Sequence, residues 1–204
     1  MNYNENEEEY SVVLKNVFKS YDNHEVLKDL SLSFLKNKIN CILGSSGKGK
    51  TTILNLIAGL IKQDKGEIFK DSKKISYMFQ EDRLILWLNV FQNIEFVLKS
   101  YKSELDRKEI IDQFIDLVEL KDYKGFFPKQ LSGGMKRRVS MARALAYESD
   151  VLILDEPFKG LDNELKYRII DRMLKVLDKR KQTIIMVTHD EAEAKYLNAN
   201  IITF

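Results

Sequence analysis

The sequence has 204 residues, of which 44% are hydrophobic and 31% are charged, and its formal net charge is +2. So small a charge gives no support to a protein that holds nucleic acid by bulk electrostatics, and we expect no nucleic-acid partner. The single cysteine, Cys41, excludes a disulfide framework within the chain, and no apolar run approaches the roughly 20 residues of a membrane span.

The first part of the chain predicts strands that lead into a glycine-rich turn and a helix. Alternating or continuous apolar character predicts strands at Ser11–Phe18, Leu30–Phe34 and Ile39–Leu43. Helical apolar spacing follows at Thr51–Ile61. Two more short strands are expected, at Glu67–Phe69 and Lys74–Phe79. Cys41 lies in one of the predicted strands and is expected to be buried.

The middle of the chain changes to helical spacing, and the end returns to alternating strands and helices. The helical segments are Val90–Tyr101, Arg107–Leu120 and Gly133–Tyr147, so Asn89–Tyr147 is predicted to be a mostly helical insert. Continuous apolar strands, typical of parallel sheets, follow at Val151–Leu154 and Thr183–Val187. The helices expected around them are Asn163–Asp178 and Glu191–Leu197, with a last strand at Ile201–Phe204. This order predicts an α/β fold with a parallel core.

The segment Gly44–Thr51 reads GSSGKGKT and matches G-x-x-x-x-G-K-[ST] at every fixed position. Its glycines let successive N–H groups point inward, and the following helix adds the positive end of its dipole, which favours phosphate. We expect Lys50 to reach the β- and γ-phosphates and the Thr51 hydroxyl to ligate Mg²⁺. An ordinary glycine turn is the alternative, and the flanking strand and helix count against it. The motif alone does not choose among GTPases, small-molecule kinases and motor ATPases.

The strand Val151–Leu154 ends in two carboxylates, Asp155 and Glu156. Ligands gather at the carboxyl ends of parallel strands, so Asp155 is expected beside the phosphate loop, where it would orient Mg²⁺ or its water. Glu156 would polarise a water for attack on the γ-phosphate. A plain strand-to-loop cap is about as good an explanation of the pair by itself, but Pro157 and Gly160–Asp162 weaken it.

A second buried strand, Ile184–Val187, is followed by Thr188, His189 and Asp190. An imidazole at this place is able to hydrogen-bond the γ-phosphate and report its presence. A surface histidine, or a neighbour of a helix cap, is the alternative. The other histidine, His24, is predicted to be an ordinary surface residue in the turn Asp22–Glu25.

Leu131–Arg138 reads LSGGMKRR, and its Ser-Gly-Gly opens a helix, which makes it a second anion site. One nucleotide does not need two such sites on one chain. Two copies arranged head to tail would use both, because the loop of one and the Ser-Gly-Gly of the other would enclose each ATP. A well-capped helix is the alternative.

On these motifs the chain resembles the ABC ATPase family along nearly its whole length. Gly44–Thr51 resembles the Walker A motif, Val151–Glu156 the Walker B motif, and Leu131–Met135 the signature, with Met135 where glutamine is usual. The resemblance implies an α/β P-loop NTPase core with a mainly parallel sheet, an N-terminal antiparallel β subdomain and a helical signature subdomain. Residues 1–204 would form one ABC ATPase domain, with the core at about 1–88 and 148–204 and the helical subdomain at about 89–147.

Four smaller features add to the resemblance. Gln80 resembles the Q-loop glutamine, which touches Mg²⁺ and relays to the membrane partner, and Gly160–Asp162 resembles the D-loop. His189 resembles the H-loop switch, and Tyr21 the A-loop aromatic that stacks on adenine.

The resemblance also implies which residues hold the substrate and which act on it. The catalytic residues it implies are Glu156, His189, Lys50 and Gln80. The metal ligands it implies are Thr51, Gln80 and Asp155. The nucleotide-binding residues it implies are Tyr21, Gly44, Ser45, Ser46, Gly47, Lys48, Gly49, Lys50, Thr51, Thr52, Ser132, Gly133, Gly134 and Asp162.

Within the family, Phe79–Leu84 with Trp87, and Leu131–Leu145, are similar to the group that imports nitrate, sulfonates and taurine. Two further residues, besides Met135, depart from the pattern. Lys48 stands at a loop position that is small in most relatives, and Leu86 stands where the group usually has proline.

The resemblance implies a subunit of a bacterial importer that binds and hydrolyses ATP with Mg²⁺ and dimerises on ATP. It would act at the cytoplasmic face of the cell membrane through permease subunits, and with a solute-binding protein. The alternatives are the ATPase of an ABC exporter and an ABC ATPase with no role in transport.

Overall fold

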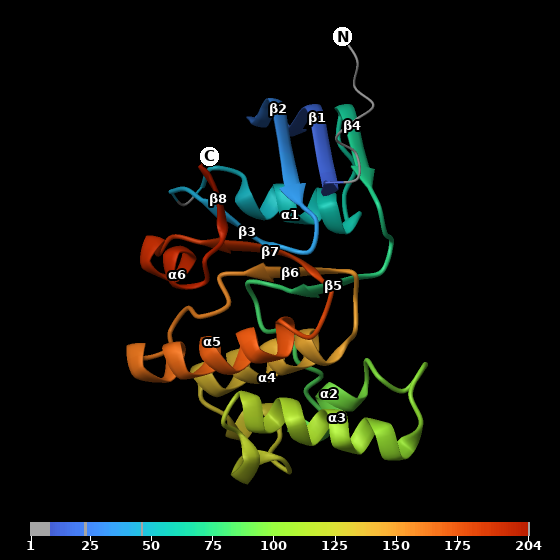
Figure 1. Cartoon of the computed structure of the whole chain (residues 1–204), viewed down its shortest axis with the longest axis vertical. Coiled ribbons are helices and arrows are strands. Elements are labelled where there is room, and N and C mark those ends of the chain that lie inside the picture. The colour runs from blue at the N-terminus through green and yellow to red at the C-terminus, as the bar shows by residue number, and fades with distance from the viewer. Residues whose placement is uncertain (1–8, 23, 46, 204) are drawn as a thin grey trace. The chain divides into compact units, whose positions relative to one another are not determined.

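A computed structural model describes residues 9–22, 24–45 and 47–203, which divide into two compact units (Figure 1). The first unit takes the described residues of Met1–Tyr77, Ser149–Glu156 and Lys181–Phe204, and the second takes Met78–Glu148 and Pro157–Arg180. Ser46, part of the predicted phosphate loop, lies outside the described residues. None of the helices within these ranges is both long and apolar enough to cross a membrane.

An antiparallel sheet of three strands, in the order β2-β1-β4, forms one part of the first unit. The strands are β1 (Tyr10–Tyr21), β2 (His24–Leu35) and β4 (Lys65–Lys70). The predicted turn Asp22–Glu25 is shorter than expected, because β2 begins at His24, which is exposed as predicted. Shifts in the β1–β2 register interrupt the alternation that would have marked the start of the strand.

A second sheet has the order β5-β6-β7-β3-β8, and its central pairs β6–β7, β7–β3 and β3–β8 are parallel. Its strands are β3 (Ile39–Leu43), β5 (Ile75–Met78), β6 (Val151–Asp155), β7 (Thr183–Thr188) and β8 (Asn200–Thr203). Every residue of β6 and β7 is buried, as expected for strands covered on both faces. The predicted α/β fold, with a parallel and an antiparallel sheet, is confirmed.

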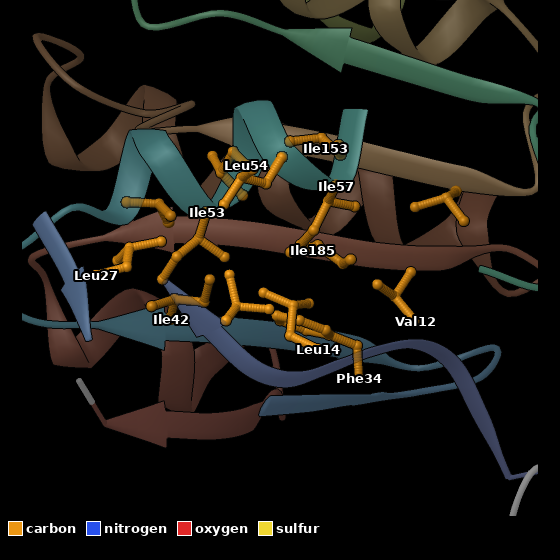
Figure 2. Close-up of a cluster of buried hydrophobic side chains, with 14 residues drawn as sticks. Val12, Leu14, Leu27, Phe34, Ile42, Ile53, Leu54, Ile57, Ile153 and Ile185 are labelled. Carbon is orange, nitrogen blue, oxygen red and sulfur yellow. The ribbon is translucent and has the colours of Figure 1, made fainter. Parts of the chain in front are cut away.

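Helix α1 (Lys50–Ala58) supplies the core of the first unit with a face of apolar side chains. Ile53 and Ile57 of α1 meet side chains from both sheets of the unit, among them Leu14 of β1 and Ile185 of β7 (Figure 2). Burial of each such side chain contributes roughly 1.5–3 kcal/mol. The helix is shorter than predicted, because Gly59 adopts a left-handed φ of 73° and caps it.

The second unit contains four α-helices in its described residues. They are α2 (Val90–Glu95), α3 (Glu104–Leu117), α4 (Gly133–Ala146) and α5 (Asn163–Leu177). The helix predicted at Val90–Tyr101 was wrong in length, because the chain beyond Glu95 continues as separate turns. These turns still bury Leu98, so the apolar spacing continued where the helix did not.

Candidate functional site

Three neighbouring strands of the parallel sheet end at the same edge of the first unit. β3 lies between β7 and β8, and β7 lies between β3 and β6, with Leu43 opposite Thr188 and Asp155 opposite Val187. Beyond these ends come the phosphate loop after β3, Glu156 after β6 and His189 after β7. Because the strands are parallel, all three segments meet at the edge where ligands bind in α/β sheets.

The phosphate loop depends on a glycine that no other residue replaces without strain. Gly49 has a φ of 85°, and a Cβ there would lie 2.9 Å from atoms of both Leu27 and Val26. It caps α1, whose first bond runs from the Ile53 N–H to the Gly49 carbonyl at 3.0 Å. The loop is thereby held close to β2, with the amino end of α1 at its base.

Lys50 is buried, and its ammonium folds back over the loop. Its Nζ donates to the carbonyl oxygens of Gly44 and Ser45, both at 2.8 Å. The positive charge is therefore held on the inner side of the loop, where it would attract a bound phosphate. Lys48, two residues earlier, is exposed.

Thr51 and Asp155 meet at the base of the loop. The Thr51 Oγ1 donates to the Asp155 Oδ2 at 3.0 Å, and Asp155 is only 1% exposed. A hydroxyl and a carboxylate oxygen side by side are hard donors of the kind that Mg²⁺ prefers, and Mg²⁺ usually takes few protein ligands besides phosphate oxygens and water. The donor set therefore fits Mg²⁺. Thr52, the next residue of α1, is 9% exposed.

Glu156 has an unusual backbone conformation and a histidine neighbour. Its φ is 49°, a left-handed value uncommon outside glycine, and its N–H donates to the Val187 carbonyl at 2.9 Å. Its Oε1 lies 3.6 Å from the His189 Nδ1, too long for a hydrogen bond but close enough for an ion pair with a protonated imidazole. Such backbone strain tends to occur where function requires it.

The turn that carries His189 is fixed by a polar pair that the sequence did not reveal. The Thr188 Oγ1 donates to the Glu193 Oε2 at 2.6 Å, and it accepts from the Asp190 N–H at 3.1 Å. Asp190 then caps α6 (Glu191–Tyr196) by accepting from the Ala192 N–H. The His189 side chain is left 62% exposed and faces Glu156.

Cys41 is fully buried in β3, as expected. Burial first, and then the negative charge of Glu193, raise the pKa of Cys41 to about 12. The thiol is therefore protonated at neutral pH and has no nucleophilic role.

Tyr21 closes β1 at some distance along the chain from these groups. It is 45% exposed, and the Lys19 ammonium lies 5.5 Å from its ring centroid. Lys19 is also held by Asp64 at 2.7 Å. The ring is therefore available to stack.

In the second unit, the signature segment begins α4. Ser132 is the N-cap, and its Oγ accepts from the Met135 N–H at 3.3 Å. A Cβ on Gly133 would meet nothing within 4 Å, whereas one on Gly134 would lie 3.7 Å from the Gly160 carbonyl oxygen. The signature and the Gly160–Asp162 segment thus lie side by side.

Asp162 has a structural task that its predicted role did not include. It is the N-cap of α5, and its Oδ1 accepts from the Leu165 N–H at 2.9 Å. The carboxylate therefore holds the amino end of a helix, whatever else it does.

Gln80 belongs to the second unit, and its side chain is exposed. Its carbonyl oxygen accepts from the NH1 of Arg137, a residue of α4, at 2.7 Å. Sequence reasoning missed Arg137 because its partner is a backbone carbonyl 57 positions away, which no residue pattern marks.

Comparison with known proteins accounts for these motifs. A family model described as "ABC transporter" matches residues 27–159. The spermidine/putrescine import ATP-binding protein PotA of Thermotoga maritima is 40% identical over 194 residues, and the match covers 90% of this chain and 53% of that protein. The aliphatic sulfonates import ATP-binding protein SsuB 2 of Pseudomonas syringae pv. tomato is 38% identical over 184 residues, 90% of this chain and 78% of that protein. The chain thus spans about half the length of the first relative and most of the second.

A solved structure agrees with the sequence relatives. It is described as a dimeric structure of a post-hydrolysis state of the ATP-binding cassette MJ0796, bound to ADP and Pi. It has a TM-score of 0.86 and 30% identity, and the match covers 95% of this chain and 94% of that one. The chain described here therefore belongs to the ABC transporter family and is an ATP-binding, ATP-hydrolysing cassette.

Proposed function

We propose that this cassette powers a bacterial importer of a small solute of the nitrate, sulfonate or taurine kind, as a homodimer that closes on ATP and Mg²⁺. The observation that carries the proposal is the meeting of Lys50, Thr51, Asp155, Glu156 and His189 at the ends of three adjacent parallel strands. Hydrolysis would reopen the dimer, so the γ-phosphate is the ligand that biases a two-state closure.

Each of these five residues has a role in the proposed reaction. Lys50 neutralises charge on the β- and γ-phosphates, with the N–H groups of the loop around it. Thr51 and Asp155 would hold Mg²⁺, which supplies charge stabilisation for the phosphoryl group when bound. Glu156 takes the proton of the attacking water, and His189, 3.6 Å from it, steadies the γ-phosphate.

Of the remaining predicted residues, some would contact the nucleotide bound to their own chain, and others would contact the nucleotide bound to a second copy of the chain. The glycines and serines of the loop, the backbone of Lys48, and Thr52 would surround the phosphates, and Tyr21 would stack on adenine. Ser132, Gly133 and Gly134 would contact the nucleotide of the partner, next to Asp162. The exposure of Ser132 and Gly133 supports this assignment. The dimeric cassette MJ0796 supports the homodimer.

A membrane partner is proposed from an exposed apolar segment that the second unit holds rigidly. Leu86 and Trp87 are 71% and 78% exposed. Asn93, fully buried, fixes the segment around them, since its Oδ1 accepts from the Ile85 N–H at 2.9 Å and its Nδ2 donates to the Leu88 carbonyl at 2.8 Å. Large apolar side chains held out to solvent are typical of docking sites. We infer that permease subunits dock here, which would put the cassette at the cytoplasmic face.

A pocket of about 530 Å³ in the second unit is a second reason to propose that a permease docks on this unit. It is lined by residues that include Asn89, Phe91, Gln92 and Lys124. The Lys124 ammonium lies 4.8 Å from the Phe91 ring centroid, and Glu95 also lines the pocket, so the pocket has an aromatic wall and charges of both signs. An amphipathic helix of a permease is the partner that suits such a pocket.

The substrate class rests on Phe79–Leu84, Trp87 and the signature helix, and on the similarity to SsuB 2. PotA, at a similar identity, is named for spermidine and putrescine. Cassettes this similar serve solutes of opposite charge, so the solute would be selected by other subunits, and a solute-binding protein is proposed among them. Residues 1–204 would act as one ABC ATPase domain, with its core at about 1–88 and 148–204 and its helical subdomain at about 89–147.

The test is hydrolysis together with co-purification from membranes. The wild-type cassette is expected to hydrolyse ATP, while Glu156→Gln binds ATP with little turnover. If Glu156→Gln hydrolyses ATP as fast as the wild type, the assignment of the base is wrong. A tagged cassette should bring down an integral membrane subunit and, with it, a solute-binding protein; recovery without any membrane subunit would contradict a role in transport.

A further inference from the structure

The loop that carries Gln80 is held by its backbone to the signature helix. Arg137 of α4 is 5% exposed, and its NH1 donates to the Phe79 carbonyl at 2.8 Å and to the Gln80 carbonyl at 2.7 Å. The same nitrogen lies 3.4 Å from the Asp82 Oδ1. Hydrogen bonds from a charged donor are roughly twice as strong as neutral ones, and a buried donor of this kind is costly to leave unpaired.

A second arginine of α4, Arg143, binds two more carbonyls of the same loop, those of Asp82 and Arg83. The NH2 of Arg143 donates to the Asp82 carbonyl at 3.1 Å, and its NH1 donates to the Arg83 carbonyl at 2.9 Å. The Arg83 guanidinium in turn lies 3.9 Å from the Phe79 ring centroid, which closes the loop on itself. The loop from Phe79 to Arg83 therefore has four carbonyls bound by two side chains of one helix.

The same helix begins at the signature. Ser132 caps α4, and Arg137 lies in its second turn. A helix is rigid over this length, so the signature and the loop of Gln80 belong to one body within the second unit. The arginines bind carbonyl oxygens, so they fix the path of the backbone and leave the Gln80 side chain exposed.

We propose that Arg137, supported by Arg143, is a positioning residue that holds the Gln80 loop on the signature helix, so that movement at either segment is passed to the other. The inference rests on the proposed function, in which Gln80 serves Mg²⁺ and the membrane partner while Ser132 serves ATP. It goes beyond that function by assigning the coupling to a residue that touches neither the nucleotide nor the metal.

A double-mutant cycle tests the proposal. The variants are Arg137→Met, Gln80→Ala and the pair, with kcat and KM for ATP measured in each. Arg137→Met is expected to lower kcat on the order of tenfold with KM nearly unchanged, and to cost less than about twofold when Gln80 is already replaced by alanine. Equal losses in both backgrounds would overturn the proposal, because Arg137 would then not act through Gln80.

Arg138→Met is the matched control. Arg138 is the next residue of α4, and its NH1 also donates to two carbonyls, those of Val118 at 2.8 Å and Glu119 at 3.0 Å. Its effect on kcat is expected to be the same in the wild-type background and in the Gln80→Ala background. If Arg138→Met shows the same dependence on Gln80 as Arg137→Met, a general loosening of α4 explains both results and the proposal fails.

Hydrogen exchange gives a readout that does not depend on turnover. Arg137→Met should speed amide exchange in residues 79–83 and leave residues 118–120 unchanged, while Arg138→Met should do the reverse. Arg137→Lys, which keeps the charge but not the planar guanidinium, should restore part of the protection and part of kcat. Unchanged exchange at 79–83 in Arg137→Met would refute the proposal, whereas a wild-type cassette without ATPase activity would refute the proposed function instead.

Discussion

Two lysines in one loop show how placement decides the role of a charge. Lys50 is buried and donates to the Gly44 and Ser45 carbonyls, both at 2.8 Å. Lys48 is exposed, and the intervening Gly49 reverses the direction of the backbone with its φ of 85°. An exposed ammonium is well solvated and gains little from a phosphate at the other side of the backbone.

We therefore predict that Lys48→Ser changes the affinity for ATP by less than about tenfold, equivalent to about 1.4 kcal/mol. Lys50→Ser, the matched variant, should lose far more because it removes the charge held inside the loop. Titration with nucleotide measures both dissociation constants. A shift beyond tenfold for Lys48→Ser would mean that its ammonium reaches the phosphates.

The raised pKa of Cys41 leads to a prediction about the stability of the protein at alkaline pH. Its pKa is raised from 9.0 to about 12 in the folded state, so above pH 9 the unfolded chain loses a proton that the folded chain keeps. The stability that the protein gains from burying Cys41 as a neutral thiol is fully present below pH 9. It is lost as the pH rises toward 12, by at most about 1.4 kcal/mol per pH unit.

Urea unfolding of the wild type and of Cys41→Ala between about pH 8 and pH 10.5 measures this contribution. The wild type should lose stability more steeply than Cys41→Ala above pH 9. The difference between the two slopes removes the effect of lysine and tyrosine titration, which both proteins share. Parallel slopes would show that burial of Cys41 does not perturb its ionisation.

At the scale of elements, helix starts coincide with the segments proposed to contact ATP. Ser132 caps α4 and Asp162 caps α5, and each accepts from the N–H three residues on. Capping residues satisfy backbone donors that would otherwise be unpaired, so they stabilise the helix as well as the segment before it. The two roles of Asp162 are separable by chemistry, since asparagine caps as well as aspartate but carries no charge.

We predict that Asp162→Ala lowers the free energy of unfolding by about 0.5–2 kcal/mol, while Asp162→Asn leaves it nearly unchanged. Denaturant unfolding of both variants checks this expectation. A comparable loss of stability in Asp162→Asn would show that charge, rather than the cap hydrogen bond, holds the start of α5. ATPase assays on Asp162→Asn would then isolate what the charge does between subunits.

The sequence predicted those elements whose signal is local. Strand β3 ends at Leu43 and helix α1 begins at Lys50, so the phosphate-loop motif follows a strand and leads into a helix as expected, because the motif and its flanks carry their own pattern. The helix predicted through Tyr101 ended at Glu95, since apolar spacing does not separate a helix from successive turns. The contacts of Arg137 and Asn93 with backbone groups were not predictable, because a carbonyl has no residue identity and its partner is set by the tertiary fold.

At the scale of the whole molecule, the two segments proposed to bind phosphate fall in different units of the chain. The loop Gly44–Thr51 lies in the first unit, and Ser132 with Gly133 and Gly134 lies in the second. In the proposed function, each unit would present one half of a nucleotide site. A second copy of the chain, in a two-fold arrangement, would complete both halves at once.

The most direct test of this central claim is the mass of Glu156→Gln in solution, measured by sedimentation with ATP, with ADP and without nucleotide. We predict a dimer with ATP and a monomer in the other two conditions. Adding Ser132→Arg, which would obstruct the signature, should leave ATP binding intact and abolish the dimer. A Glu156→Gln cassette that binds ATP and remains a monomer at concentrations far above its dissociation constant would contradict the account.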